Sequence, residues 1–291
     1  ADEQGTSFVP GNQDIFKDRI EFNPPSTPTA GLFPAFVPRG TLEGWKETIN
    51  FYNRDDFELH QFVVGTAFGS PLMQFSSVKC AALHLYSKES GVGKNTERHR
   101  GEAWSLLAVT TGNTSIVERI SIIKAMPKAE AQRILECRVK TIHFKTKKET
   151  DDFSAAIEEN YGYAGVAYVQ YLMNNLDAAK KLLVEVRERV DREAGLTAEN
   201  RFWSATIAGL LLAQKAGLID YNVEKIFKWA VQQLKENKQQ VEDMSLSVEE
   251  TLNNYINEHW NNVLWIKSQD LREDGEEALV IPEMMAKGQL V

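Results

Sequence analysis

The chain has 291 residues, is 43% hydrophobic and carries a formal net charge of −8 at pH 7, as expected for a globular protein of one large domain or two smaller ones. No apolar run approaches the roughly 20 residues that span a bilayer, and the acidic balance argues against a surface built broadly for nucleic acid. The two cysteines, Cys80 and Cys137, lack metal-ligand spacing. With no signal peptide in view, we expect a reduced, cytoplasmic protein without a membrane partner.

The N-terminal part is expected to be an arm followed by two helices. Residues 1–40 are rich in Pro, Gly and polar residues and read as an extended arm. A capping threonine precedes a predicted helix over Leu42–Tyr52. The apolar pattern of Phe57–Phe68 predicts a buried helix. Gly65 and Gly69 are expected to permit close packing against a neighbour.

The most informative motif follows a predicted buried strand, Ala81–Tyr86. The next residues, Ser87–Lys94 (SKESGVGK), end in the Gly-Lys pair of a Walker A loop. Such a loop surrounds phosphates with backbone N–H groups, a helix N-terminus and a lysine. The predicted phosphate-binding residues are Ser90, Gly91, Val92, Gly93 and Lys94. A chance surface turn is the alternative interpretation.

The residues after this loop depart from the Walker pattern. The hydroxyl residue that would hold Mg²⁺ is replaced by Asn95, and no apolar run ends in the acidic pair that binds Mg²⁺ and activates water. Only 18 residues separate Lys94 from Asn113, whereas a strand–helix–strand unit needs roughly 30. We therefore expect on the order of 60 or more residues to be missing between Lys94 and Asn95. No metal ligand is assigned.

Two further strands carry candidate catalytic residues. The run Ser105–Thr111 predicts a strand followed by Asn113, the position at which AAA+ ATPases orient the attacking water. A turn residue is the alternative. The run Ile134–Ile142 predicts a third strand, and Arg133 directly before it is a candidate arginine finger for the γ-phosphate in a neighbouring subunit. An exposed arginine paired with a nearby glutamate is the alternative.

The pattern turns helical after about residue 151. Predicted helices cover Leu176–Val190, Ala198–Ala216, Val223–Asn237 and Val248–Trp265. Arg201, near the start of the second of these, is a candidate to contact the phosphates from a lid, and a solvated arginine is the alternative. A basic cluster, Lys140, Lys145, Lys147 and Lys148, either touches nucleic-acid phosphates or guards an edge strand, which we favour. His84, inside a strand, is expected to be packed.

These features predict an α/β fold, in which a P-loop AAA+ ATPase core is followed by an all-helical lid and C-terminal domain. The expected divisions are an arm over residues 1–40, a core over 41–150 with residues missing between 94 and 95, and a helical domain over 151–291.

As an ordered series, the motifs resemble a family of phage and mobile-element AAA+ helicases, over about residues 40–220. The matching segments include Gly40–Trp45 (GTLEGW), Ala67–Leu72 (AFGSPL), Ser90–Lys94, Thr110–Asn113, Gln132–Glu136 and Asn160–Gly165 (NYGYAG). The order of phosphate loop, polar strand end, arginine and lid is also distantly similar to minichromosome-maintenance helicases.

The resemblance implies a ring-shaped, hexameric ATPase that uses ATP and Mg²⁺ as a DNA helicase or translocase. Its partner would be single-stranded or forked DNA in phage or mobile-element replication, in the host cytoplasm. Two alternatives stay open. One is a non-catalytic nucleotide-binding assembly module, and the other is a phage DNA-packaging motor or another P-loop ATPase.

Overall fold

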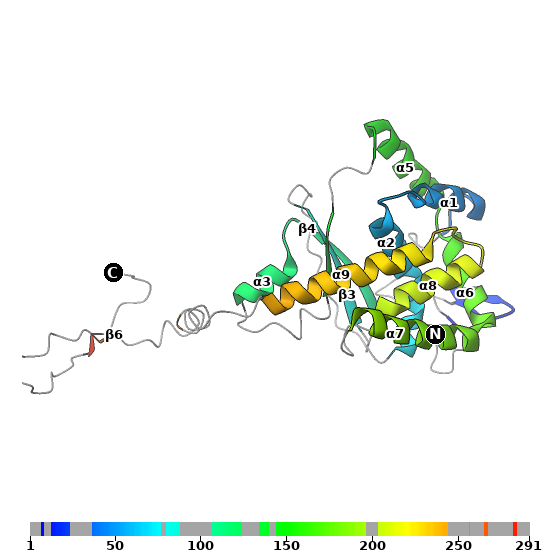
Figure 1. Ribbon diagram of the computed structural model, residues 1–291. Helices are drawn as coiled ribbons and strands as arrows, with labels where there is room; N and C mark the ends of the chain where they lie inside the picture. The colour runs from blue at the N-terminus through cyan, green and yellow to red at the C-terminus, as the bar shows by residue number, and fades with distance from the viewer. Residues whose placement is uncertain are drawn as a thin grey trace, which may run out of the picture.

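The structure, a computed structural model, describes residues 7–8, 13–23, 37–76, 80–87, 106–123, 134–139, 144–195, 203–243, 256, 265–266 and 282–283. A parallel sheet of three strands lies within the helices (Figure 1). Its strands are β3 (Cys80–Tyr86), β4 (Leu106–Gly112) and β5 (Ile134–Arg138), in the spatial order β4-β3-β5. This mixed α/β arrangement agrees with the predicted fold class at that level.

The segment before the sheet is helical, as predicted. It contains α1 (Leu42–Ile49), η2 (Asn50–Tyr52), α2 (Glu58–Gly69) and η3 (Ser70–Phe75), where η denotes a 3-10 helix. Thr41 caps α1, because its hydroxyl accepts a hydrogen bond from the backbone N–H of Gly44 at 2.9 Å. The helix predicted over Leu42–Tyr52 is therefore present, with its last turn tightened into η2.

Six further helices follow the first two strands of the sheet. They are α3 (Ile116–Ile123), α5 (Lys147–Glu159), α6 (Tyr163–Asn174), α7 (Leu176–Ala194), α8 (Trp203–Lys215) and α9 (Val223–Asp243). The helices predicted over Leu176–Val190 and Val223–Asn237 are confirmed, and both are longer than predicted. None of the helices in the described part is long and apolar enough to cross a membrane.

Two short antiparallel pairs complete the described elements. The helix predicted to run to Trp265 is wrong at its end, because Trp265 begins the short strand β6 (Trp265–Ile266), which pairs with β7 (Pro282–Glu283). Near the N-terminus, β1 (Gln13–Ile15) and β2 (Ile20–Phe22) form a hairpin. Its Ile15 is 0% exposed and packs with residues of α6.

The helices α2 and α8 touch at the level of their backbones. A Cβ built on Gly209 of α8 would lie 2.5 Å from the backbone nitrogen of Gly69, and one built on Gly69 would lie 2.8 Å from the backbone of Ala205. No side chain larger than hydrogen fits at these two positions. The close packing predicted for Gly69 is confirmed, and it helps to join the buried residues of α2, the sheet and α6–α9 into one contiguous core.

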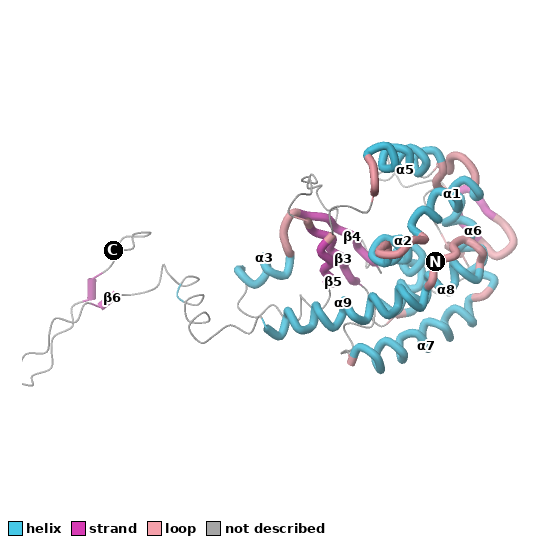
Figure 2. Tube along the Cα trace, turned by 45° about the horizontal axis from the view of Figure 1, so that its top comes forward, coloured by secondary structure: helices cyan, strands magenta, loops and turns pink. Residues whose placement is uncertain are grey.

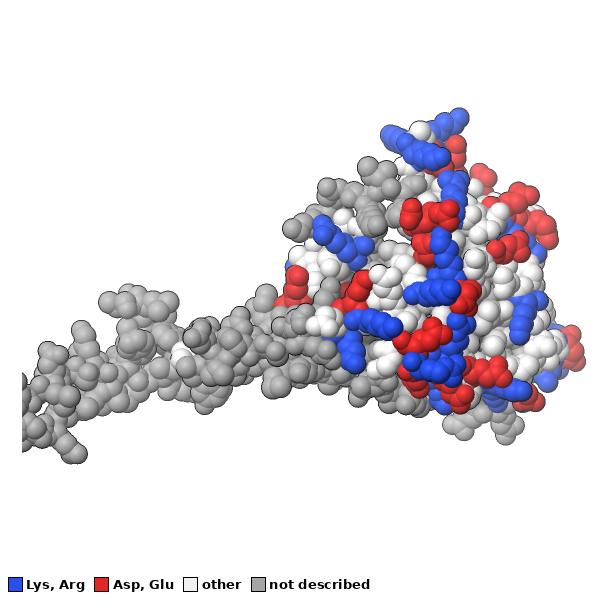
Figure 3. All heavy atoms as spheres, in the orientation of Figure 1, with Lys and Arg blue, Asp and Glu red and all other residues white. Residues whose placement is uncertain are grey.

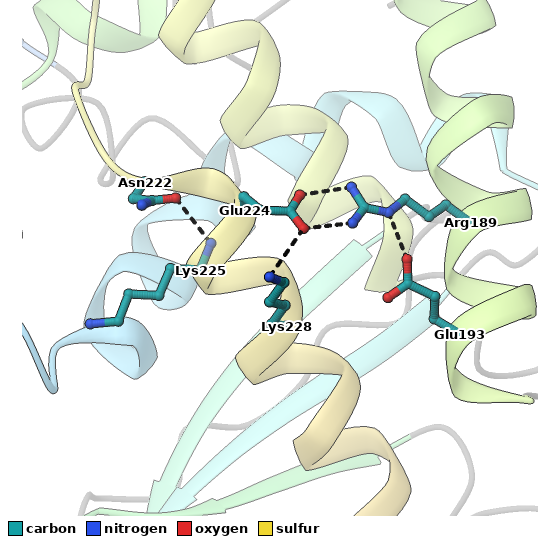
Figure 4. Close-up of polar contacts among 6 residues, drawn as sticks. All are labelled: Arg189, Glu193, Asn222, Glu224, Lys225 and Lys228. Atoms are coloured by element: carbon teal, nitrogen blue, oxygen red, sulfur yellow. Dashed lines mark hydrogen bonds and ion pairs between the residues drawn. The ribbon is translucent and has the colours of Figure 1, made fainter.

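Ion pairs hold the start of α9 between two other helices (Figure 4). The guanidinium of Arg189 on α7 donates two hydrogen bonds, at 2.7 and 2.8 Å, to the carboxylate of Glu224, and it lies 4.0 Å from the ring centre of Phe227. Lys225 binds the carboxylate of Glu58, at the start of α2, at 2.6 Å. The same helix end is thereby tied to α7 and to α2.

The charged face of the molecule is largely self-neutralised. Figure 3 shows lysine and arginine side chains in a band that runs from α5 across α9 to α7, with acidic side chains beside them. Within this region Arg54 pairs with Glu149 at 2.8 Å, and Arg189 and Lys225 have the acidic partners described above. This band therefore does not form a continuous unpaired basic track for a DNA backbone.

Replacing Gly209 with Ala is expected to destabilise the protein by about 1–3 kcal/mol, because the added methyl must push two helix backbones apart. The matched control is Gly165→Ala in the first turn of α6, where an added Cβ meets no atom within 4 Å. This control is expected to be neutral or to stabilise by up to about 1 kcal/mol. Urea unfolding followed by circular dichroism measures both changes. Equal effects of the two substitutions would contradict the close packing.

The Arg189–Glu224 pair is expected to contribute about 0.5–1 kcal/mol to stability at pH 7, since both side chains are partly exposed and solvent-screened. The hydrogen bond from Arg189 lowers the pKa of Glu224 below its model value of 4.5. The contribution is therefore present above pH 4.5 and is lost as the pH falls through this lowered pKa.

A double-mutant cycle with Arg189→Gln and Glu224→Gln, measured by urea unfolding at pH 7 and at acid pH, checks this pair. The exposed Lys181–Glu185 pair, at 3.9 Å, is the control and should give almost no coupling. A coupling energy for Arg189 and Glu224 that does not fall on acidification would argue against the interaction.

Candidate functional site

The three parallel strands end side by side, where the predicted phosphate loop begins. Tyr86 is in register with Gly112 on one side and with Arg138 on the other. The backbone N–H of Ser87 donates to the carbonyl of Gly112 at 3.1 Å. The link from β4 to β5 passes β3, so this is the end of the sheet at which chain directions diverge, where α/β proteins bind ligands.

Asn113 lies beside the start of the predicted phosphate loop. It follows Gly112, the register partner of Tyr86, and is therefore level with Ser87. The side chain is half-buried. The strand predicted over Ser105–Thr111 is present as β4, and it brings Asn113 to the end of the sheet that the sequence indicated.

His84 is packed inside the sheet, as predicted. It is 3% exposed, and its Nε2 lies 3.0 Å from the carbonyl oxygen of Thr114. Because a carbonyl oxygen only accepts hydrogen bonds, Nε2 must carry a hydrogen. In the neutral ring Nδ1 then accepts from the hydroxyl of Thr110, at 2.9 Å. The Tyr86 ring is stacked 6.0 Å away at 5°. The histidine thus joins β3 to the turn that follows β4.

Sequence reasoning missed Glu136, a buried carboxylate beneath this turn. Glu136 is 7% exposed, accepts a hydrogen bond from the Ser115 hydroxyl at 2.5 Å and accepts from the backbone N–H of Val117 at 3.2 Å. Its charge lies at the positive N-terminal end of α3, which stabilises a buried anion. A Ser115-x-x-Glu118 capping pattern signalled this helix, and Ser115 does accept from the N–H of Glu118 at 2.9 Å.

The backbone of the same glutamate binds a helix distant in sequence. The N–H of Glu136 donates to Oδ1 of Asn237 at 3.2 Å, and Nδ2 of Asn237 donates to the carbonyl of Glu136 at 3.1 Å. An amide side chain of α9 thus occupies the place of a neighbouring strand beside β5. The adjacent Cys137 thiol is inert at neutral pH, because burial raises its pKa to about 12.

Most predicted site residues lie outside the described residues. These are Ser90, Gly91, Val92, Gly93, Lys94, Arg133 and Arg201. The strands still fix where two of the segments must attach. The phosphate loop leaves the carboxyl end of β3, and Arg133 immediately precedes Ile134, which begins β5. Because β3 and β5 are parallel, Arg133 enters the sheet at the end opposite to the phosphate loop.

The described start of α8 lies on the far side of the molecule from β3's carboxyl end in sequence order. Ser204 shares a small pocket with Phe75 and Ser76, which precede β3, whereas the phosphate loop follows that strand. The proposed contact of Arg201 with the phosphates stays a prediction. Among the described residues, no group of three His, Cys, Asp or Glu side chains is placed to hold a metal ion.

The basic cluster differs from the interpretation that we favoured. Lys147 and Lys148 begin helix α5 and do not lie on an edge strand. Thr146 explains the helix, because its hydroxyl accepts from the N–H of Glu149 at 3.1 Å. The carboxylate of Glu149 in turn accepts from the N–H of Lys145 at 2.8 Å. Lys140 lies outside the described residues.

Comparison with known proteins supports the fold. No protein-family model and no curated protein matches this chain. A solved structure of Cch from SCCmec type IV, described as an active helicase, superposes with a TM-score of 0.58 at 11% sequence identity. The match covers 77% of this chain and 56% of that one. The chain therefore spans little more than half of that protein, and the similarity is one of fold.

Replacing Glu136 with Gln is expected to cost about 1–3 kcal/mol of stability, because an amide cannot accept all the hydrogen bonds that Ser115 and the start of α3 donate. The exposed Glu158→Gln on α5 is the control and should change stability by less than about 0.5 kcal/mol. Urea unfolding at pH 7 compares them. Indistinguishable effects would show that the Glu136 network does not stabilise the fold.

Proposed function

We propose that this chain is an ATP-dependent DNA helicase or translocase of the AAA+ type, working as a hexameric ring in phage or mobile-element DNA replication. One observation carries the proposal. The register of β3 and β4 sets Asn113 level with Ser87, from which the Walker-like loop departs. A phosphate loop and a polar amide on adjacent parallel strands are the arrangement that ATP hydrolysis requires. The fold shared with a protein described as an active helicase gives independent support.

Each predicted residue has a defined task in this proposal. The backbone amides of Ser90–Gly93 and the ammonium of Lys94 hold the β- and γ-phosphates. Bound ATP with Mg²⁺ supplies the phosphoryl group and a cation that neutralises charge. The Asn113 amide orients the attacking water, and the hydrogen bond between Ser87 and Gly112 keeps its distance from the loop constant. We assign the Mg²⁺-binding acidic pair to residues missing between Lys94 and Asn95.

The strand directions favour a role for Arg133 in a neighbouring subunit. β3 is seven residues long, so its two ends are about 20 Å apart at the usual rise per residue. Arg133 precedes the start of the parallel strand β5, at the end away from the phosphate loop of its own chain. An arginine there reaches a γ-phosphate more directly in an adjacent copy. Shared sites of this kind are what a ring ATPase uses.

A non-catalytic nucleotide-binding module is the second candidate. In its favour, β3 and β4 pair directly in parallel, and the residues between them are enough for one crossover of a dozen or more residues. An intact mass near 32.9 kDa favours this module, whereas a mass several kilodaltons higher favours missing residues. Strand separation on forked DNA distinguishes a helicase from a packaging motor, which moves along duplex DNA without separating it.

Subunit mixing tests the shared site. Lys94→Ala and Arg133→Ala are each expected to abolish ATP hydrolysis, the first by removing the phosphate contact and the second by removing the finger. A mixture of the two proteins is expected to regain activity, since an intact loop then meets an intact finger at some interfaces. DNA-stimulated phosphate release measures all three samples.

Two controls accompany the mixing experiment. Lys181→Ala, on the exposed face of α7, should hydrolyse ATP at the wild-type rate. The Arg133→Ala protein should still bind ATP, while Lys94→Ala should not. Failure of the mixture to regain activity, with both proteins folded and assembled, would rule out the finger. Unchanged turnover in Lys94→Ala would rule out the ATPase.

A further inference from the structure

A cleft of about 740 Å³ lies between α1, α2 and α6, apart from the carboxyl ends of the strands. Its walls include Trp45, Val64, Ala67, Phe68, Gly165 and Tyr168. The volume falls within the range of about 300–1,000 Å³ that is usual for small-molecule sites. The start of η3, which leads into β3, also lines it, whereas the phosphate loop leaves the other end of that strand.

The cleft offers no charge to a ligand. No Asp, Glu, Lys, Arg or His occurs among the described residues that line it. A charged group placed inside would lose its hydration without gaining a partner, which is strongly unfavourable. The part of a ligand that enters must therefore be neutral.

Three aromatic side chains form a continuous wall. The rings of Trp45 and Phe68 meet edge to face at 6.3 Å, and those of Phe68 and Tyr168 meet at 4.9 Å. Aromatic rings attract further rings in stacked and edge-to-face geometries beyond the effect of buried area. This wall favours a planar aromatic ligand over an aliphatic one.

One wall residue also carries an unmatched hydrogen-bond donor. Tyr168 is 2% exposed, and its buried hydroxyl has no hydrogen-bond partner in the described part of the chain. Burial raises the pKa of this tyrosine well above its usual range, so the hydroxyl keeps its proton and is able to donate. Leaving such a group unsatisfied costs about 1–3 kcal/mol. A ligand with an acceptor atom would remove that cost.

Gly165 adds a second sign of a built site. It lies in the first turn of α6, and a Cβ placed on it would meet no atom within 4 Å. Neither a close neighbour nor a left-handed backbone requires glycine here, although glycine weakens a helix relative to alanine. The space that a side chain would fill belongs to the cleft.

From these features together, we propose that the cleft binds an uncharged aromatic or heteroaromatic ring that carries a hydrogen-bond acceptor for the Tyr168 hydroxyl. The ring belongs either to a free small molecule or to the base of a nucleotide whose charged part stays outside. This site is separate from the phosphate loop and goes beyond the proposed ATPase activity.

Benzimidazole and indole test the chemistry, since the rings are nearly the same size and only benzimidazole has a ring acceptor nitrogen. Ligand-observed NMR titration of the full chain at pH 7.5 is expected to show that both bind. Tyr168→Phe should weaken benzimidazole about fivefold, as expected for one hydrogen bond, and leave indole unchanged. Gly165→Leu and Ala67→Phe, which fill the cleft, should each weaken both rings at least tenfold.

Ala178→Leu, an exposed position on α7 outside the cleft, is the matched control and should bind both rings as wild type does. Thermal unfolding establishes that each variant is folded. Absence of binding up to the solubility limit of benzimidazole would overturn the proposal, as would undiminished binding in both cleft-filling variants.

Two further measurements identify the source of the ring. If adenosine binds, is displaced by ATP, and Gly165→Leu raises the KM for ATP, the ring is the nucleotide base. If ATP does not displace the bound ring, the ligand is a free small molecule. Both results support the site. Lys94→Ala should bind benzimidazole normally, so failure of the ATPase proposal and failure of this one are distinguishable.

Discussion

The backbone contact between α2 and α8 is the constraint on which the rest of the fold depends. α2 leads through η3 directly into the central strand β3, and α8 is the most deeply buried helix of the C-terminal part. At Gly69 and Gly209 no side chain separates the two backbones. The helical part is therefore fixed relative to β3 with almost no freedom to slide, because any shift brings backbone atoms into collision.

The start and middle of α9 extend this rigidity to the remaining layers. Its first turn binds α7 through Arg189 and α2 through Lys225. Four turns later, Asn237 holds the backbone of Glu136 in β5. One helix thus contacts the helical part, the segment before the sheet and the sheet itself (Figure 2). A displacement of α9 would be felt at the turn that carries Asn113, because Glu136 also supports the start of α3.

The sequence predicted those elements whose signals are local and repeated. The helices around Leu176–Val190 and Val223–Asn237 have regular apolar stripes, and the strand Ala81–Tyr86 is a continuous apolar run. Helix α3 was missed because its eight residues follow a Gly-Asn pair that resembles the end of a strand. The favoured edge-strand interpretation of Lys147 and Lys148 failed because the capping pattern at Thr146 was not used.

The polar network of the site was beyond local pattern. Glu136 and Asn237 are separated by 101 residues, and an asparagine inside a helix normally indicates a surface position. The position of Asn113 at the end of a strand was predictable, because strand endings have clear signals. The catalytic roles of Asn113, Lys94 and Arg133 are chemical assignments and stay predictions.

The amide of Asn237 also determines how this sheet can be enlarged. By occupying the outward backbone groups at the middle of β5, it seals that edge as a neighbouring strand would. On the opposite side, within the described residues, β4 has β3 as its one strand neighbour, and its Val109 is 42% exposed. Growth of the sheet is therefore one-directional. Any strand that is added, whether by insertion into the chain or by another molecule, must join beside β4, next to the strand that ends at Asn113.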